Sequence, residues 1–332
     1  MSVQDVITTR ELVLDQIRNA DRFLLITHEN PDGDALGSLV ATHGMLRKLG
    51  KDTLMYLPES DFPLPYEYRF FRLDGHVTAV PDDLAERTAI FLDCGNADRS
   101  PIEVGDVPVL NVDHHHDNTR FGTVNHVVDD ASCTAEIVWD LMGALGVRPS
   151  LEMAEALYVG LVTDTGRFMY DSTGRTAHLM AADLIEQGVD THLIYRRLYE
   201  GIPFAKLELL GRALERARRV DDGRLTVAML RAEDFRETGA EESYSEGIID
   251  HLRSVEGTCV AALVRERNVS APTRKVSLRA TGDEVDVSAI ARAQGGGGHR
   301  RAAGFSTDFG EDEIVSFLRD AVAAQLSAQP GS

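Results

Sequence analysis

Acidic and imidazole side chains follow short apolar runs in the first half of the chain. The segment ITHENPDGDALGS, at residues 26–38, places a histidine and two aspartates directly after the apolar run RFLLIT. Groups of the same kind end the segments FLDCGN, NVDHHHDN and LVTDTGRF. The residues concerned are His28, Asp32, Asp34, Asp93, Asp113, His114, His115 and Asp164. An ordinary core strand or helix needs none of them, so they indicate a functional site.

The aspartates in these segments favour bound cations. Four of them lying together would repel one another, and their pKa values would rise unless cations lay between them. Those four are Asp32, Asp34, Asp93 and Asp164. Carboxylates mixed with imidazoles suit Mn²⁺ or a similar octahedral ion, and a pair of ions about 3.5–4 Å apart is a common arrangement for hydrolysing phosphate esters. The sequence therefore predicts two divalent ions, with Mn²⁺ preferred.

Each acidic residue also has an ordinary structural explanation. Asp34 could cap a helix, the NPDGD segment could be a turn, and Asp93 could simply end a strand. Gly33 and Gly37 would let the backbone approach a metal or a phosphate closely. Because the motifs occur together, each at the end of an apolar run, the functional explanation is preferred.

Alternating strand and helix patterns must position these groups. Continuous apolar runs typical of buried parallel strands cover 22–27, 52–58, 88–93 and 107–113. Helical spacing of apolar residues covers 35–50, 134–146, 151–162 and 174–188. Together they predict an α/β domain over residues 1–190, with a doubly wound and mainly parallel sheet. The carboxyl ends of such strands face one crevice, so the acidic and imidazole groups can converge there.

The pattern changes after about residue 190. Residues 191–218 are charged and helical, which is typical of a linker between domains. Residues 219–328 then predict a smaller α+β domain with a mixed sheet. Its strand patterns cover 224–230, 259–267 and 274–280, and its helix patterns cover 243–254, 287–294 and 311–326.

Composition excludes several classes of function. The formal charge of −20 argues against a broad surface for long nucleic acids, because such binding depends on clustered Lys and Arg. The three cysteines are far apart and form no CxxC pair, so a disulfide framework or a structural zinc site is not expected. No apolar run is long enough to cross a bilayer. These features predict a cytoplasmic protein without a membrane partner.

The motifs resemble a known enzyme family. HENPDGDALGS, FLDCGN, VDHH and VTDTGRF are similar to the four successive motifs of the DHH phosphoesterases. The segment GGGGHRRAAG, at 295–304, resembles the glycine-rich signature of the DHH-associated C-terminal domain. The two-domain layout most resembles the bacterial nanoRNases, which cleave short oligonucleotides and often also dephosphorylate adenosine 3′,5′-bisphosphate.

The resemblance implies a role for each motif residue. His28 and Asp32 would hold the first metal, and the second metal would be held by Asp34, His114 and Asp164. Asp93 would bridge the two ions and, with His115 pointing at the scissile phosphate, act in catalysis. Asp113 would orient a histidine. The nucleophile would be a water molecule whose pKa the ions depress.

The second domain is expected to grip the substrate in a cleft between the two lobes. Gly296, Gly297 and Gly298 could turn backbone amides toward an anion, and His299 follows them. Arg279, in KVSLRA, matches a strand residue that relatives use to meet a phosphate or base. His116 and Cys133 lie beside the motifs and have no assigned role; Cys133 could simply precede a helix.

The preferred interpretation is a metal-dependent phosphodiesterase, an oligoribonuclease that releases nucleoside monophosphates from very short RNA as a homodimer. Adenosine 3′,5′-bisphosphate is a further expected substrate. An alternative is hydrolysis of cyclic dinucleotides or of their linear products, and no residue separates the two. A RecJ-like exonuclease for long strands is disfavoured by the short, acidic chain. A non-catalytic RNA-binding module would gain nothing from four convergent aspartates.

Overall fold

The computed structural model describes residues 3–100, 102–266 and 273–328. Two compact units divide the chain, Met1–Glu200 (unit 1) and Gly201–Ser332 (unit 2). The boundary between them falls within the segment 191–218, which the sequence predicts as a helical linker. That segment contains two helices, α6 (Thr191–Tyr199) in unit 1 and α7 (Phe204–Glu215) in unit 2.

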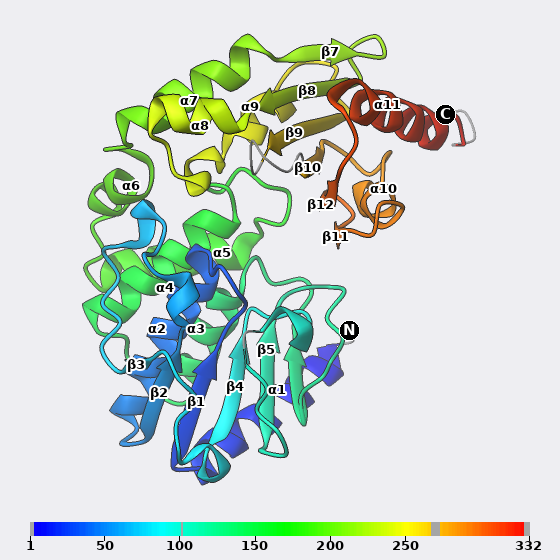
Figure 1. Ribbon diagram of the computed structural model, residues 1–332. Helices are drawn as coiled ribbons and strands as arrows, with labels where there is room; N and C mark the ends of the chain where they lie inside the picture. The colour runs from blue at the N-terminus through cyan, green and yellow to red at the C-terminus, as the bar shows by residue number, and fades with distance from the viewer. Residues whose placement is uncertain (1–2, 101, 267–272, 329–332) are drawn as a thin grey trace. The chain divides into compact units, whose positions relative to one another are not determined.

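In the described part of unit 1, six parallel strands form one sheet in the order β3-β2-β1-β4-β5-β6 (Figure 1). The strands are β1 (Arg22–Ile26), β2 (Asp52–Tyr56), β3 (His76–Val77), β4 (Thr88–Leu92), β5 (Val109–Asp113) and β6 (Val124–Val127). Strand β1 lies near the centre of the sheet, β2 and β3 follow on one side of it, and β4, β5 and β6 follow on the other. This order is that of a doubly wound sheet, so the predicted fold class is confirmed.

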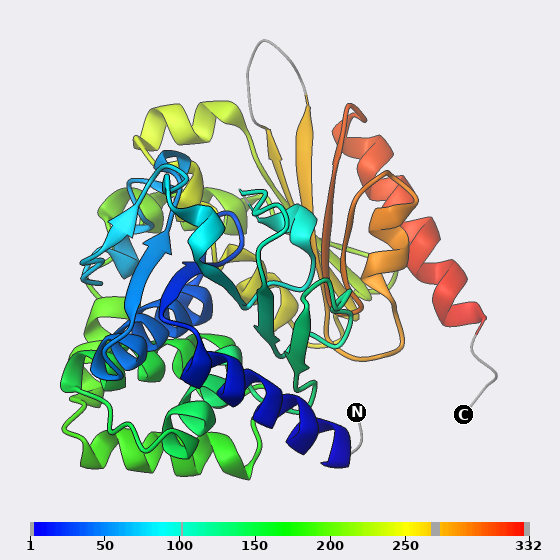
Figure 2. The same ribbon diagram turned by 90° about the horizontal axis from the view of Figure 1, so that it is seen from below.

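Helices of unit 1 share one hydrophobic core with the sheet. They are α1 (Val3–Asn19), α2 (Gly33–Lys48), α3 (Thr134–Ala144), α4 (Leu151–Asp164), α5 (Arg175–Glu186) and α6. Leu39 of α2, Leu141 of α3 and Leu157 of α4 are buried in this core together with Phe23 and Leu25 of β1. The sequence analysis did not predict α1, which packs beside β6 and appears in dark blue in Figure 2.

The opposite face of this sheet has a smaller core of its own, against which Leu84 of η3 (Leu84–Glu86) packs. The other 3-10 segments of unit 1 are η1 (Glu59–Asp61), η2 (Tyr66–Tyr68) and η4 (Ala97–Arg99), and Tyr68 of η2 packs against the helical core. Leu24 and Ile26 of β1 are buried there, and Phe91 of β4 meets Phe121 edge-on at 5.1 Å between ring centroids. Consecutive residues of β1 therefore point into two cores, which explains why its sequence is apolar without alternation.

Helices α2 and α4 approach each other closely. A Cβ atom added at Gly37 of α2 would lie 2.3 Å from the carbonyl oxygen of Ala156 in α4, and one added at Gly33 would lie 2.4 Å from Oγ1 of Thr163. These glycines therefore allow α2 to pack against α4, which brings the N-terminus of α2 beside the C-terminus of α4. Their expected role in admitting a metal or a phosphate stays a prediction.

Unit 2 is built on a mixed sheet, whose described strands have the order β11-β12-β10-β9-β8-β7. Strands β8 and β9 are parallel, and the other neighbouring pairs are antiparallel. The strands are β7 (Arg218–Val220), β8 (Leu225–Leu230), β9 (Val260–Glu266), β10 (Arg274–Ala280), β11 (Gly297–His299) and β12 (Ala302–Thr307). The predicted mixed-sheet α+β domain is confirmed.

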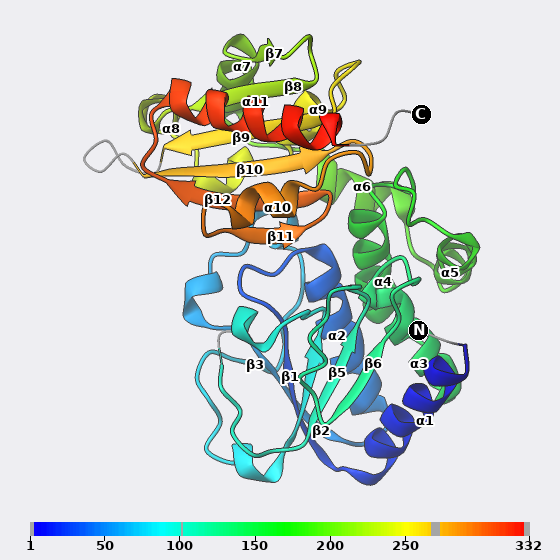
Figure 3. The ribbon, with the colours of Figure 1, turned by 90° about the vertical axis from the view of Figure 1, so that its right-hand side faces the viewer.

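Two helices cover one face of this second sheet, as Figure 3 shows: α10 (Val287–Arg292) and α11 (Glu311–Ser327). Ile290 of α10 and Leu318 of α11 are buried against Val264, Val276 and Leu278 of the strands. The remaining helical segments of unit 2 are α7, α8 (Ala232–Thr238), η5 (Glu242–Ser245) and α9 (Ile248–Arg253). Of the helices described in either unit, none combines the length and the apolar character that a bilayer crossing requires.

Candidate metal centre

The carboxyl ends of β1, β4 and β5 bring the predicted acidic and imidazole side chains together within unit 1. Three overlapping groups have ligand atoms that lie within 4.8 Å of one another. The groups are His28 with Asp32 and Asp93; Asp34 with His114 and Asp164; and Asp93 with His114 and His115. Every metal ligand that the sequence analysis proposed is therefore found in this cluster, although the structure alone assigns no role to any of them.

His28 and Asp32 come from the turn between β1 and α2. The Nδ1 atom of His28 lies 2.9 Å from the carbonyl oxygen of Glu29, a contact that directs Nε2 toward Asp93. Asp32 is the N-cap of α2, and its Oδ1 accepts the backbone N–H groups of Asp34 and Ala35 at 3.0 and 3.1 Å. The capping bonds fix the carboxylate of Asp32 in place at the start of the helix.

Asp34 is held by the N-terminus of another helix. Its Oδ2 accepts the backbone N–H of Thr134 at 2.6 Å, and its Oδ1 accepts the backbone N–H of Ala135 at 2.9 Å. These amides belong to the first turn of α3, where unpaired N–H groups and the helix dipole favour an anion. The buried carboxylate of Asp34 thus occupies the position that a phosphate could otherwise take at this helix start.

Asp93 lies at the centre of the cluster, just after β4. It is 2% exposed and has a left-handed backbone, with φ of 57°. Its Oδ1 accepts a hydrogen bond from Oγ1 of Thr134 at 3.0 Å and lies 3.6 Å from Nε2 of His114, while its Oδ2 lies 3.7 Å from Nε2 of His28. Burial opposes ionisation of Asp93, but these histidines and His115 lower its pKa. Asp93 therefore offers a charged oxygen to each side of the cluster.

The remaining carboxylates are crowded by like charges. Burial and the charges of Asp93 and Asp164 raise the pKa of Asp34 well above its usual value. Burial also raises the pKa of Asp164 to about 7; the attraction of His114 opposes this rise, and the charges of Asp93 and Asp32 add to it. The protein atoms alone thus disfavour full ionisation of the cluster, which divalent cations would favour.

The spacing of the donor atoms also fits cations. Nε2 of His114 lies 3.5 Å from Oδ2 of Asp164, and the two separations from Asp93 to His114 and His28 are 3.6 and 3.7 Å. These separations are too long for good hydrogen bonds, and they leave room for an ion bonded to both atoms. An imidazole and carboxylate donor set suits Mn²⁺ and similar ions.

His115 is tied to a buried aspartate instead. Its Nδ1 lies 2.7 Å from Oδ1 of Asp113, whose Oδ2 accepts a hydrogen bond from Nδ2 of Asn118 at 2.6 Å. Burial lowers the pKa of His115, but the bond to Asp113 and the charge of Asp93 outweigh that effect and raise it to about 9. The contact with Asp113 therefore orients the side chain and favours its protonated form.

Two residues of this network were missed by the sequence analysis. The hydroxyl of Thr134 contacts Asp93, and the amide of Asn118 contacts Asp113. Thr134 follows Cys133, which takes the N-cap position of α3 without a side-chain capping bond and is buried. Cys133 is therefore a packing residue at the helix start. His116 lies on the exposed turn after β5.

In unit 2, Arg279 lies on β10 and is half-buried. Its partners in register are Ala261 on β9 and Ala302 on β12, and its Nη1 donates to the carbonyl oxygen of Leu278 at 3.1 Å. Successive residues of a strand point to opposite faces of the sheet. Leu278 is buried in the core of unit 2, so Arg279 lies on the other face, beside these two small neighbours.

The tetraglycine segment leads into a strand. Gly297 and Gly298 lie in β11 and pair with Gly304 and Ala303 of β12. Cβ atoms added at Gly296 and Gly298 would lie 2.2 and 2.5 Å from backbone oxygens of β12, so both positions require glycine. The backbone of Gly297–His299 pairs as a strand at the edge of the sheet, and binding of an anion by amides of this segment stays a prediction. His299 pairs with Ala302 in β11, and its side chain lies outside the described part of the structure.

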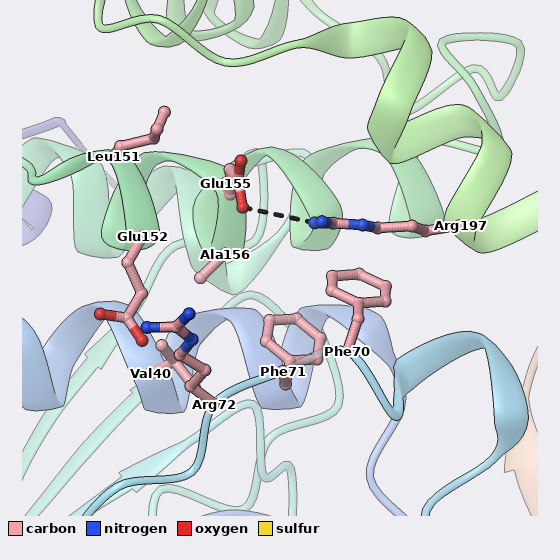
Figure 4. A pocket seen from close by; sticks show the side chains of 9 residues that line it. All are labelled: Val40, Phe70, Phe71, Arg72, Leu151, Glu152, Glu155, Ala156 and Arg197. Carbon is pink, nitrogen blue, oxygen red and sulfur yellow. Dashed lines mark ion pairs between the residues drawn. The ribbon is translucent and has the colours of Figure 1, made fainter.

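A separate cavity in unit 1 does not coincide with the cluster. It measures about 340 Å³ and lies between α2, α4 and α6, where Arg197 pairs with Glu155 at 3.5 Å (Figure 4). The rings of Phe70 and Phe71 stack at 5.0 Å beside it. None of the proposed metal ligands lines this cavity. The Arg197 and Glu155 charges are already paired, so the cavity provides no evident chemistry.

Comparisons with known proteins agree with this geometry. Residues 22–161 match the DHH family, N-terminal domain, and residues 222–327 match the DHHA1 domain. The first match contains the segments that supply most of the cluster, although Asp164 falls just beyond it. The second match contains Arg279 and the glycine-rich strand.

Individual relatives cover most of the chain. A bifunctional oligoribonuclease and PAP phosphatase, NrnA, from Thermus thermophilus is 35% identical over 84% of this chain and 82% of its own length. The cyclic-di-AMP phosphodiesterase GdpP of Geobacillus thermodenitrificans is 23% identical over 92% of this chain and 48% of its own length. The crystal structure of an exopolyphosphatase-related protein from Bacteroides fragilis shares the fold, with a TM-score of 0.87, 23% identity and 97% coverage of both chains.

Proposed function

Because the chain belongs to the DHH family and is a hydrolase of phosphoric ester bonds, we propose that it is a metal-dependent phosphodiesterase for very short RNA. Nucleoside monophosphates would be its products, and adenosine 3′,5′-bisphosphate a further substrate. The observation that carries this proposal is the cluster of His28, Asp32, Asp34, Asp93, His114 and Asp164. The similarity to the Thermus enzyme supports the choice of substrate.

We assign His28 and Asp32 to one cation, and Asp34, His114 and Asp164 to a second. Asp93 is assigned to both, since its two oxygens face histidines on opposite sides of the cluster. Bound divalent ions, most consistent with Mn²⁺, would lower the pKa of an attacking water and supply Lewis-acid charge. The amides of Thr134 and Ala135 hold the carboxylate of Asp34 in a fixed orientation for this role.

His115 is assigned to the phosphate. Its Nδ1 bonds to Asp113, so Nε2 is the nitrogen that would donate to a phosphate oxygen or to the leaving oxygen. An imidazole N–H at that position is suited to stabilising negative charge that develops in the transition state. Asp113 keeps that imidazole in one orientation throughout the reaction.

Short substrates suit the charge of the chain. With a net charge of −20, the protein lacks the cationic excess on which binding of long polyanions relies. Arg279, and His299 with the glycines 296–298, are proposed to hold the nucleotide. Assembly as a homodimer and a cytoplasmic location remain predictions.

One alternative substrate class has specific support. The relative from Geobacillus is named a cyclic-di-AMP phosphodiesterase, and its similarity extends over nearly the whole of this chain. Hydrolysis of a cyclic dinucleotide uses the same attack of water on a phosphodiester. The residues of the cluster would be shared by both reactions, so the choice between them depends on substrate contacts outside it.

A side-by-side assay tests the proposal. The protein, stripped of metal and then supplied with Mn²⁺, would be given a linear ribodinucleotide, a cyclic dinucleotide and adenosine 3′,5′-bisphosphate. We expect the dinucleotide to have the highest kcat/KM, with no turnover in the presence of a chelator. Faster cleavage of the cyclic dinucleotide would favour the alternative, and failure to hydrolyse all three would refute the proposed function.

A further inference from the structure

The segment that follows α4 folds back in an unusual backbone conformation. Gly166, Arg167 and Phe168 have φ values of 55°, 64° and 64°. Left-handed backbone is disfavoured for residues other than glycine, so two successive examples need support from their surroundings. Such conformations cluster at functional sites, and this turn begins two residues after Asp164.

Side-chain packing supplies that support. The ring of Phe168 stacks on His178 of α5, with 5.2 Å between centroids and 22° between planes. The guanidinium of Arg167 lies 5.2 Å from the ring centre of Tyr199 in α6. These two contacts direct Arg167 and Phe168 toward neighbouring helices and fix the turn.

Backbone hydrogen bonds also stabilise the turn. The N–H groups of Met169 and Tyr170 both donate to the carbonyl oxygen of Thr165 at 3.0 Å. A Cβ atom added at Gly166 would lie 2.4 Å from the ring of Tyr170, so the ring rests directly against the Gly166 backbone. Met169 and Tyr170 therefore form the fixed apex of the segment.

The far end of the segment is attached beside the metal centre. Oγ of Ser132 donates to the carbonyl oxygen of Ser172 at 3.0 Å. Ser132 precedes the start of α3, where Thr134 contacts both Asp34 and Asp93. The apex thus lies on a short loop whose two ends meet residues of the candidate centre.

The two apex side chains are unusually exposed for their chemistry. Met169 is 73% exposed and Tyr170 is 38% exposed. Large apolar groups gathered at the surface mark binding sites, and an aromatic ring beside a thioether suits the flat face of another ring. Proteins that bind single-stranded nucleic acid place aromatic side chains in this way, and successive bases stack on them without regard to sequence.

We propose that Met169 and Tyr170 form a stacking platform for one nucleobase of the substrate, placing its phosphate at the metal centre. This inference rests on the proposed function, because it names a contact that the same reaction would use. The platform carries no hydrogen-bonding pattern that distinguishes bases, since every base has a π-face. It therefore positions the nucleotide and leaves the base identity open.

The test compares substrates with and without a base. Tyr170→Leu removes the ring, and Tyr170→Phe keeps it. Each variant would be assayed on a ribodinucleotide and on two analogues, in each of which one of the two nucleobases is replaced by hydrogen. The matched control is Leu151→Ser, which alters a side chain that is 50% exposed at the other end of α4.

The proposal predicts a loss that depends on the base. Tyr170→Leu should reduce kcat/KM on the dinucleotide by about 5- to 150-fold, mostly through KM. Tyr170→Phe and Leu151→Ser should stay within about twofold of the wild type. On one of the two base-deleted analogues, Tyr170→Leu and the wild type should be equally active. An equal loss on all three substrates, or no loss on the dinucleotide, would overturn the platform.

Direct binding separates this inference from the proposed function. If the wild type does not hydrolyse the dinucleotide, the proposed function fails, and the platform is then tested by binding of adenosine monophosphate against ribose 5-phosphate. Weaker binding of the nucleotide alone in Tyr170→Leu would support the platform. Unchanged binding of both ligands would refute it.

Discussion

Nδ1 of His115 and Oδ1 of Asp113 lie 2.7 Å apart at the end of β5, where Asp113 is buried and His115 is half-buried. The second oxygen of Asp113 is held by Asn118, so the carboxylate cannot rotate without losing a bond. A carboxylate fixed in this way determines both the orientation and the charge of the imidazole it contacts.

Asp113→Asn should therefore lower kcat on a ribodinucleotide by about 10- to 100-fold, with metal content unchanged. The amide is isosteric but uncharged, so it no longer stabilises the cationic form of His115. Steady-state kinetics at saturating Mn²⁺ measure the effect, and Asp117→Asn in the exposed turn nearby is the control. Activity within twofold of the wild type would show that Asp113 does not act through His115.

Asp93→Ala should abolish turnover and weaken the response of the protein to metal. In the wild type, Mn²⁺ should raise Tm as its concentration increases, because it binds the folded state. Removal of a carboxylate that lies between His28 and His114 should remove most of that increase. Thermal melting with and without Mn²⁺ measures it, with circular dichroism to show that the variant is folded. Near-normal Mn²⁺-dependent activity would refute the assignment of Asp93 to two ions.

The hydroxyl of Thr134 provides a more subtle test of the same centre. Thr134→Val removes the hydrogen bond to Asp93 but preserves the shape of the side chain. It also preserves the backbone N–H that donates a hydrogen bond to Asp34. We expect about a 10-fold weaker affinity for Mn²⁺, measured by metal titration. Thr134→Ser, which retains the hydroxyl, should stay near the wild type. Equal Mn²⁺ affinities of the Thr134→Val and Thr134→Ser variants would show that this hydrogen bond does not position Asp93.

The metal cluster could be predicted from the sequence because its geometry follows from topology. Parallel strands end at one edge of a sheet, so residues placed after β1, β4 and β5 converge wherever the fold is doubly wound. His28, Asp93 and His114 all follow this rule.

Other contacts depend on partners that are distant in sequence. Asp34 accepts a hydrogen bond from the backbone N–H of Thr134, which lies 100 residues away along the chain. No local sequence pattern shows which helix N-terminus will face which carboxylate. The strand at Gly297–His299 could not be predicted from the sequence for a related reason. Polyglycine has no intrinsic preference for a strand, and here pairing with β12 imposes one.

Arg279→Ala should affect the grip on nucleotide without affecting the chemical step. We expect a loss of about 1–3 kcal/mol, or about 5- to 150-fold in kcat/KM, on a ribodinucleotide. Hydrolysis of a small activated phosphodiester should remain near the wild-type rate, and Arg292→Ala, at an exposed position of α10, should change neither reaction. His299→Ala is expected to behave like Arg279→Ala. If His299→Ala abolished the small-ester reaction with metal content unchanged, His299 would act in catalysis.

Chain length of the substrate should affect the rate strongly. Dinucleotides to pentanucleotides should be cleaved much faster than long single strands, because an acidic protein gains little from additional phosphates. The salt dependence of kcat/KM should be shallow for the same reason. A length series at several salt concentrations tests both points, and a steep salt slope with rapid degradation of long RNA would favour a RecJ-like activity.

His126 should make the free energy of unfolding depend on pH. It is 1% exposed on β6, and its Nδ1 lies 2.9 Å from Oγ1 of Thr9 in α1. Burial lowers its pKa to about 4, with Asp140 raising it slightly and Arg10 lowering it. In the unfolded chain the pKa is about 6.5, so the unfolded state binds more protons between these two values. The stabilisation from a neutral His126 is complete above about pH 6.5 and is lost as the pH falls toward 4.

Between pH 7 and pH 5 this residue should account for about 2 kcal/mol of lost stability. Urea unfolding in the presence of a chelator would be measured at both pH values for the wild type and for His126→Gln, which cannot titrate. Carboxylates contribute equally to both proteins, so the difference between their pH dependences isolates His126. Because protonation should weaken the packing of α1 against β6, the hydrogen-exchange protection factors of α1, which correct for the intrinsic effect of pH, should also fall at pH 5 in the wild type alone. Parallel pH dependences in the two proteins would show that His126 remains accessible to protons in the folded state.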